Sequence, residues 1–213
     1  MADAADRLSP ARATRMRVLL FGPPGSGKGT QAAMLAQRLS VPAISTGEMF
    51  RQAVAGGSEL GRKVEKILAA GELVDDATTA EVVRARLAQA DARGGFVLDG
   101  YPRTLTQAAT LEEILRTHGA ALDAAVFLEV PERELVRRMS GRREQGGRAD
   151  DRPEVVSERL RVYQEKTAPL VEHYRELGLL RRVDGNRPAA AVGEAILTTL
   201  GDRGDDLASR RVV

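Results

Sequence analysis

The sequence of 213 residues contains neither cysteine nor tryptophan, and it has only two histidines. Without cysteine, the chain can form no disulfide and no cysteine-based zinc site, and it has no thiol nucleophile. The two histidines, His118 and His173, are too few for a histidine-rich metal site. The chemistry of the protein must therefore come from other side chains, and we expect it to use no zinc.

Long hydrophobic runs and an excess of charge of either sign are also missing. No apolar run approaches the roughly 18 residues of a membrane-spanning helix, and residues 1–10 lack the apolar segment of a signal peptide. The 32 basic residues are nearly balanced by 30 acidic ones, which does not favour a nucleic-acid-binding protein. We therefore expect a soluble, cytoplasmic protein with neither a membrane nor a nucleic acid as partner.

Short apolar runs alternate with segments of helical periodicity, which is typical of a parallel sheet covered by helices on both faces. The apolar runs are 18–21, 42–44, 96–98, 125–130 and 179–183. The helical segments are 28–39, 77–90, 104–118, 131–140, 153–177 and 188–200. The sequence therefore predicts an α/β fold of three layers with a five-stranded parallel sheet.

Two internal segments interrupt this alternation. Residues 45–74 are helical in pattern but rich in glycine, and residues 141–151 are rich in glycine and arginine. Glycines at the margins of such insertions would let them move. We expect a core domain over 15–201 that carries both insertions, between a flexible extension at 1–14 and a flexible tail at 202–213.

The strongest motif is GPPGSGKGT at residues 22–30, directly after an apolar run and before a helical segment. Its glycines let successive backbone N–H groups point at phosphate oxygens, and the following helix adds its positive N-terminal end. Lys28 can reach the β- and γ-phosphates, and Thr30 or Ser26 can face Mg²⁺, although Gly29 separates the lysine from Thr30. The motif predicts an ATP or GTP site of the P-loop NTPase type. We expect it to be formed by Gly25, Ser26, Gly27, Lys28, Gly29 and Thr30.

One apolar run ends in a carboxylate, Asp99. In a parallel sheet this position lies at the carboxyl edge, where ligands bind and where the phosphate loop also begins. An acid at that place can hold Mg²⁺ through water, because the ion usually keeps several of its waters. Alternatively, Asp99 could simply form a turn before Gly100, but beside a phosphate loop the sequence favours the Mg²⁺ role.

At this point the chain resembles a known family. GPPGSGKGTQ is similar to the phosphate loop of adenylate kinases, including the displaced threonine. The further blocks of that family follow in order as ISTGEMFR (44–51), GELV (71–74), GFVLDGYPRTLTQA (95–108), GRR and GRADD (within 141–151) and KTAPL (166–170). The resemblance covers residues 16–200. It implies a monomeric adenylate kinase of the short-lid type, which catalyses Mg²⁺-dependent transfer between ATP and AMP to give two ADP, for adenine nucleotide homeostasis.

The resemblance also implies an AMP pocket within the first insertion and the following strand end. Arg51 and Arg103 would bind the AMP phosphate, Thr46 would face the base, and Gln107 would hydrogen-bond adenine. A glutamine amide, with one acceptor and two donors, suits an amino group beside a ring nitrogen. The implied AMP-binding residues are Thr46, Gly47, Arg51, Glu72, Leu73, Val74, Gly100, Tyr101, Pro102, Arg103, Gln107, Arg148 and Arg159.

A lid over both nucleotides is the third implied feature. Arg138 and Arg142 are four residues apart, so they share one face if a single helix contains both. The resemblance directs these two arginines toward ATP, and Arg148 and Arg159 toward the transferring phosphoryl group. The implied catalytic residues are Lys28, Arg103, Arg142, Arg148 and Arg159.

The resemblance implies three further positions. Asp150 and Asp151 match acidic positions of the lid, and Arg187 matches the place where the backbone approaches the base of ATP. Because the lid is short and the chain has no cysteine, we expect no zinc there. The arginine-rich run could instead be a solvated surface or a nucleic-acid patch, but the adjoining acids and the lack of interleaved aromatics argue against nucleic acid.

Other functions remain possible at this stage. UMP/CMP kinases and other nucleoside monophosphate kinases share the scaffold, although Thr46 and Gln107 favour adenine. A GTP-dependent switch protein would need an Asn-Lys-x-Asp motif, which cannot exist because the only asparagine, Asn186, precedes Arg187. A nucleotide-binding protein without catalysis is the remaining alternative.

Overall fold

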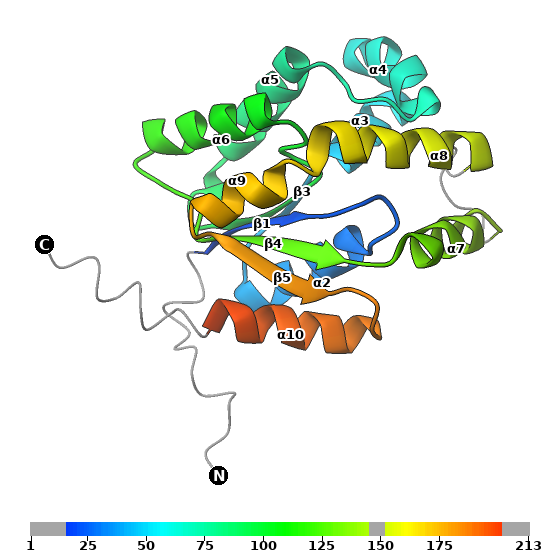
Figure 1. Ribbon diagram of the computed structural model, residues 1–213. Helices are drawn as coiled ribbons and strands as arrows, with labels where there is room; N and C mark the ends of the chain where they lie inside the picture. Colours follow the sequence, from blue (N-terminus) through cyan, green and yellow to red (C-terminus); the bar gives the residue numbers. More distant parts are fainter. Residues whose placement is uncertain (1–15, 145–151, 202–213) are drawn as a thin grey trace, which may run out of the picture.

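The computed structural model describes residues 16–144 and 152–201, and Figure 1 presents its elements along the chain. Five strands, all parallel, form one sheet in the order β2-β3-β1-β4-β5. The strands are β1 (Arg17–Phe21), β2 (Ala43–Ser45), β3 (Phe96–Asp99), β4 (Ala124–Glu129) and β5 (Leu180–Asp184). The predicted α/β fold and its five-stranded parallel sheet are confirmed.

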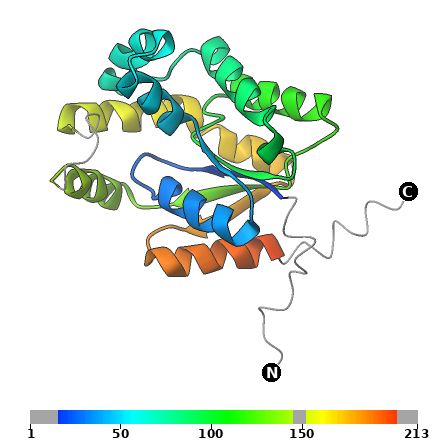
Figure 2. The same cartoon turned by 180° about the vertical axis from the view of Figure 1, so that it is seen from behind.

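The sheet is buried on both faces, as the unbroken apolar character of its strands predicts. In β1, Leu19 and Phe21 belong to one core cluster, and Val18 and Leu20 belong to the other, as the two-residue period of a strand requires. Helices α2 (Lys28–Leu39) and α10 (Ala189–Gly201) cover one face. Figures 1 and 2 show these helices on one side of the sheet and most of the others opposite them. The cluster on the opposite face includes residues of α5 (Asp76–Leu87), α6 (Leu105–Thr117) and α9 (Leu170–Glu176).

The remaining helices form two smaller units beside this core. Helices α3 (Thr46–Ala55) and α4 (Glu59–Ala70) pack on each other around Phe50, Val64 and Val74. Helices α7 (Glu132–Glu144) and α8 (Pro153–Val162) share a second cluster that contains Met139 and Val156. A short 3₁₀ turn, η2 (Ala90–Ala92), precedes β3. None of the described helices is both long and apolar enough to cross a membrane.

The prediction of one continuous helix over 153–177 is wrong, because the structure divides this segment into three elements. Helix α8 ends at Val162, a π-helical turn covers Tyr163–Thr167, and α9 begins at Leu170. Within the turn, the N–H of Ala168 donates to the carbonyl of Tyr163 at 2.9 Å, which is the wider spacing of a π-helix. Pro169 then stands at the start of α9, where its missing N–H breaks no helical hydrogen bond. The other five expected helices are present with slightly shifted ends.

The close approach of α3 and α4 depends on Gly61. A Cβ atom added at Gly61 would lie 2.0 Å from the carbonyl oxygen of Ala53, which belongs to the backbone and cannot move aside. We expect Gly61→Ala to lower the free energy of unfolding by about 1–3 kcal/mol, measured by urea denaturation. Gly141→Ala is the matched control in α7, because a Cβ atom added there would have no described atom within 4 Å beyond its own helix backbone. We expect this variant to raise the free energy of unfolding by about 0.5–1 kcal/mol. Equal stability of the two variants would contradict this packing argument.

Candidate active site: two adjoining cavities at the carboxyl edge of the sheet

The phosphate loop, residues 22–27, joins the end of β1 to the start of α2. Gly22, Gly25 and Gly27 have positive φ angles of 146°, 84° and 91°, which residues with a side chain rarely adopt. A Cβ on Gly22 would lie 2.8 Å from the carbonyl oxygen of Leu128, and one on Gly25 would lie 2.9 Å from that of Leu135. The loop is therefore wrapped tightly against the end of β4 and the start of α7 (Glu132–Glu144), and only glycine fits at these two places.

Lys28 carries its charge into the centre of this loop. Its Nζ donates to the carbonyl oxygens of Gly22 and Pro23, both at 2.8 Å, and lies 3.4 Å from the hydroxyl oxygen of Ser26. These oxygens hold the ammonium group where the backbone amides of the loop and the N-terminal end of α2 also concentrate positive charge. The arrangement suits a bound polyphosphate.

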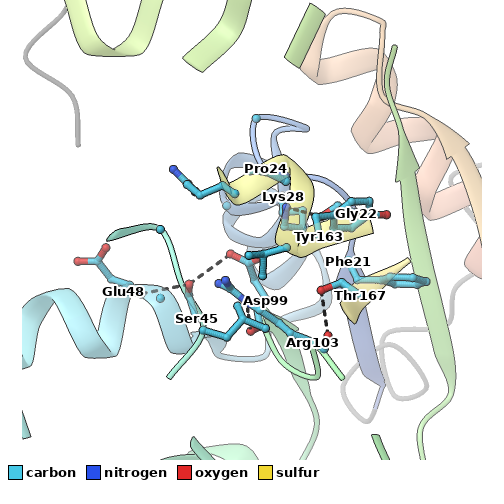
Figure 3. Close-up of a pocket in the computed structure, with 18 of the residues that line it drawn as sticks. Phe21, Gly22, Pro24, Lys28, Ser45, Glu48, Asp99, Arg103, Tyr163 and Thr167 are labelled. Carbon is cyan, nitrogen blue, oxygen red and sulfur yellow. Dashed lines mark hydrogen bonds between the residues drawn. The ribbon is translucent and has the colours of Figure 1, made fainter. Parts of the chain in front are cut away.

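A cleft of about 580 Å³ opens beside the loop, and Figure 3 shows part of its lining. It brings together cationic side chains from four helices, including Lys28 at the start of α2, and from one loop. Arg51 comes from α3, Arg142 from α7 and Arg159 from α8, while Arg103 lies between β3 and α6. The cationic residues that line the cleft are Lys28, Arg51, Arg103, Arg142 and Arg159. Such a concentration of positive charge in one hollow favours a ligand with several phosphates.

Asp99 is the buried acid of this cleft, only 8% exposed, whereas the other two acids of the lining, Glu48 and Glu72, are exposed. Its Oδ2 accepts a hydrogen bond from the Ser45 hydroxyl at 3.2 Å, whereas its Oδ1 has no hydrogen-bond partner among the described residues. A buried carboxylate oxygen without a donor is costly unless a ligand or water completes it. The donor set therefore fits a hydrated Mg²⁺ ion held through water, beside a loop that binds phosphates.

Two guanidinium groups converge on the backbone of Gly47, across the cleft from the phosphate loop. A Cβ on Gly47 would lie 3.2 Å from Nη1 of Arg51 and 3.7 Å from Nη2 of Arg103. The Arg103 side chain is held by a hydrogen bond from its Nε to the carbonyl of Gly100 at 2.8 Å, and Arg51 pairs with Glu48 at 3.0 Å. Paired guanidinium groups of this kind suit the oxygens of a phosphate.

A smaller cavity of about 30 Å³ adjoins the cleft and shares several lining residues with it. This is close to the volume of one water molecule, so a base could bind there only if the cavity widens. It is lined by Thr46, Gly47, Phe50, Leu68, Glu72, Leu73, Val74, Thr79, Gly100, Arg103 and Gln107. Most residues expected in the AMP pocket therefore meet at one place, although the sequence separates them widely.

Several expected site residues lie elsewhere. Arg138 pairs with Glu134 at 2.7 Å and donates to the carbonyl of Gly185 at 3.1 Å. Hydrogen bonds from Arg137 and Arg138 lower the pKa of Glu134 to about 2. Arg187 is exposed in the segment between β5 and α10.

Three more expected residues, Arg148, Asp150 and Asp151, lie outside the described residues.

Sequence reasoning missed several lining residues. Ser45 ends β2 beside Asp99, and its place at a strand end was a signal that could have found it. Thr167 lines the cleft from the π-helical turn, and its hydroxyl donates to the carbonyl of Arg103 at 2.9 Å, as Figure 3 shows. No helical periodicity predicts where a residue in such a turn points, so the only signal for Thr167 was its place in the KTAPL block (166–170), to which we gave no role.

A phosphate loop faces paired arginines across one cleft, on a parallel sheet flanked by helices. The fold and the site together define a P-loop phosphotransferase that acts between two phosphorylated ligands. Comparison with known proteins identifies the family within this class.

Residues 20–179 match the family described as adenylate kinase. A protein of Thermobifida fusca is 49% identical over 188 residues, which cover 88% of this chain and all of that relative. One of Kocuria rhizophila is 48% identical over 86% of this chain and 98% of its own length, and one of Xylella fastidiosa is 46% identical over 87% and 100%. All three relatives carry the name adenylate kinase. The chain belongs to the adenylate kinase family, whose general reaction converts ATP and AMP into two ADP.

Tyr101 gives a prediction that concerns stability. The residue is fully buried, its hydroxyl has no hydrogen-bond partner among the described residues, and burial raises its pKa to about 12. Because a tyrosine in the unfolded chain ionises near pH 10 and Tyr101 in the fold only near 12, the free energy of unfolding is unaffected by this titration below pH 10 and declines as the pH rises from about 10 toward 12. We expect Tyr101→Phe to raise the free energy of unfolding at pH 7 by about 1 kcal/mol and to weaken the alkaline decline. Denaturation at pH 7 and pH 11 measures both, and a variant less stable at pH 7 would contradict this account.

Proposed function

We propose that this chain transfers the γ-phosphoryl group of ATP to the phosphate of AMP, using the residues gathered in the large cleft. The observation that carries the proposal is the pair of anion-binding places that face each other there. The phosphate loop with Lys28 is one, and the converging guanidinium groups of Arg51 and Arg103 are the other. A donor and an acceptor held across one cleft are placed for direct transfer.

On the donor side, the loop amides and Lys28 bind the phosphates of ATP. Lys28 exchanges the carbonyl oxygens that it contacts for phosphate oxygens, which accept hydrogen bonds more strongly because they are charged. Asp99 would hold Mg²⁺ through water by its Oδ1, which has no hydrogen-bond partner among the described residues. When bound, Mg²⁺ neutralises charge on the oxygens of the donor phosphates.

On the acceptor side, Arg51 and Arg103 hold the phosphate of AMP so that one of its oxygens faces the donor. Arg142 and Arg159 approach the same space from α7 and α8 and stabilise charge on the transferring group. Arg148 supplies a further guanidinium group in our proposal. Water is the competing acceptor, so segment 45–74 closes over the substrates and excludes it, whereas most of the expected lid, 141–151, lies outside the described residues.

Adenine is the proposed base on the acceptor side because Thr46 and Gln107 line the smaller cavity next to the paired arginines. A UMP or CMP kinase remains the second candidate within the class. We place the activity in a cytoplasmic monomer that acts on small nucleotides and not on nucleic acids, and we expect neither zinc nor a membrane to take part.

The acceptor assignment is tested by measuring ADP formation from Mg·ATP with AMP, UMP, CMP and GMP in separate reactions. We expect AMP to exceed each of the others by at least about tenfold in kcat/KM. Lys28→Ala and Arg103→Ala should each lower the rate with AMP by about 100-fold or more. Arg38→Ala is the matched control, since Arg38 is exposed and pairs with Glu194 at 2.9 Å, and it should leave the rate unchanged. No AMP-dependent ADP would refute the proposal.

Asp99→Asn tests the metal assignment. The amide keeps the size of the side chain and its contact with Ser45, but it removes the charge that would orient the metal-bound water. We expect the Mg²⁺ concentration for half-maximal rate to rise, or the rate to fall, by about 10–100-fold. Without nucleotide the variant should be at least as stable as the original chain, because a buried and incompletely bonded carboxylate is costly. An unchanged Mg²⁺ titration would show that Asp99 has no such role.

A further inference from the structure

The hydrogen bonds of Gln107 extend beyond the residues of the proposed reaction. Gln107 is only 2% exposed and lines the smaller cavity. Its Oε1 accepts from the backbone N–H of Arg103 at 2.7 Å, and its Nε2 donates to Oδ1 of Asp76 at 2.7 Å. Both heavy atoms of the amide are thus held by protein neighbours.

These neighbours fix which way the amide faces. A backbone N–H can only donate a hydrogen bond, and an ionised carboxylate can only accept one. If the amide flipped, its NH₂ group would face the N–H of Arg103 and its oxygen would face the carboxylate of Asp76, so both contacts would become repulsive. The orientation therefore follows from the chemistry of Arg103 and Asp76.

Asp76 is itself held in place. It is the first residue of α5, and its carboxylate accepts from the hydroxyl of Thr104, with distances of 3.2 and 3.3 Å to its two oxygens. The Thr104 oxygen in turn accepts from the backbone N–H of Gln107 at 3.1 Å. Asp76, Thr104 and Gln107 form a closed ring of hydrogen bonds behind the smaller cavity.

We propose that Asp76 is a positioning residue that selects for a base with an amino group, by locking the amide of Gln107. The proposal rests on the proposed function, in which Gln107 contacts the acceptor base. With the amide locked, one lone pair of Oε1 and one N–H of Nε2 remain for a ligand. They match an exocyclic amino group beside an unprotonated ring nitrogen.

A base with an oxo group beside a ring N–H has the opposite pattern. It would place acceptor against acceptor and donor against donor, and the ring of bonds prevents the flip that would relieve this mismatch. Inosine monophosphate (IMP) differs from AMP in this edge alone, so AMP and IMP are the substrate pair that isolates the effect. A binding site strongly rejects an analogue that leaves the buried polar groups of the site without a hydrogen-bond partner.

The test compares AMP and IMP kinetics in the full chain and in Asp76→Ala. Removal of the carboxylate frees Nε2, so we expect the KM for AMP to rise about tenfold and the preference for AMP over IMP in kcat/KM to fall by a similar factor. The KM for ATP and the kcat at saturating AMP should stay within about twofold, because neither depends on the base edge of the acceptor. Equal losses with AMP and IMP would overturn the proposal.

Two variants separate positioning from helix stability. Asp76→Asn keeps an oxygen that can accept from Nε2, so it should restore the KM for AMP to within about threefold of the original. Asp75→Ala is the matched control, since Asp75 caps the same helix through the N–H of Thr78 at 2.8 Å and its side chain has no hydrogen bond to Gln107 among the described residues. It should lower the melting temperature and leave the AMP preference unchanged. If Asp76→Ala fails to fold, Asp76→Ser takes its place with the same expected direction.

The double variant Asp76→Ala with Gln107→Ala distinguishes the positioning role of Asp76 from the base contact of Gln107 in the proposed function. In the Gln107→Ala background, Asp76→Ala should add no further loss with AMP, because its effect passes through the missing amide. Additive losses would overturn the positioning role. If Gln107→Ala alone leaves the KM for AMP unchanged, the base contact of the proposed function is wrong. If Gln107→Ala raises it and Asp76→Ala does not, only the present inference fails.

Discussion

The site depends on one constraint, the common direction of the five strands. Because every strand runs the same way, all of their carboxyl ends meet at one edge of the sheet. The register places Asp99 beside Leu20 of β1 and beside Ser45 of β2, so the acid and its hydroxyl partner lie next to the start of the phosphate loop. Residues far apart in sequence therefore meet without any long or strained connection.

Arg103 joins the two cavities into one unit. Its N–H is bound by Gln107, its carbonyl by Thr167 and its side chain by the carbonyl of Gly100. Gln107 in α6 and Thr167 in the π-helical turn hold the backbone of Arg103 on two sides, and Gly100, just after β3, holds its side chain. A side chain held in this way loses little further freedom on binding an anion, which favours both affinity and geometric accuracy.

The sequence allowed the sheet and the phosphate loop to be predicted because their signals are local. Val18 to Phe21 form a continuous apolar run, and Gly22 to Lys28 follow it at once. The family resemblance supplied residues such as Arg51 and Gln107, which no periodicity would have joined. Thr167 lies in the quoted KTAPL block, but its contact with Arg103 could not be predicted from periodicity, because a π-helical turn changes the direction of each later side chain relative to an α-helix.

The cationic side chains of the cleft differ from the surface arginines in what holds them in place. Exposed pairs such as Arg161 with Glu158 and Glu165 are worth at most about 1 kcal/mol, since water and salt screen them. Lys28 and Arg103 instead lie near other cations, and backbone carbonyls hold them there. The free energy that anionic ligands release on binding to these cations also stabilises the whole fold. Although the net charge of the chain is nearly zero, five cationic side chains line one cleft at the carboxyl ends of the parallel strands.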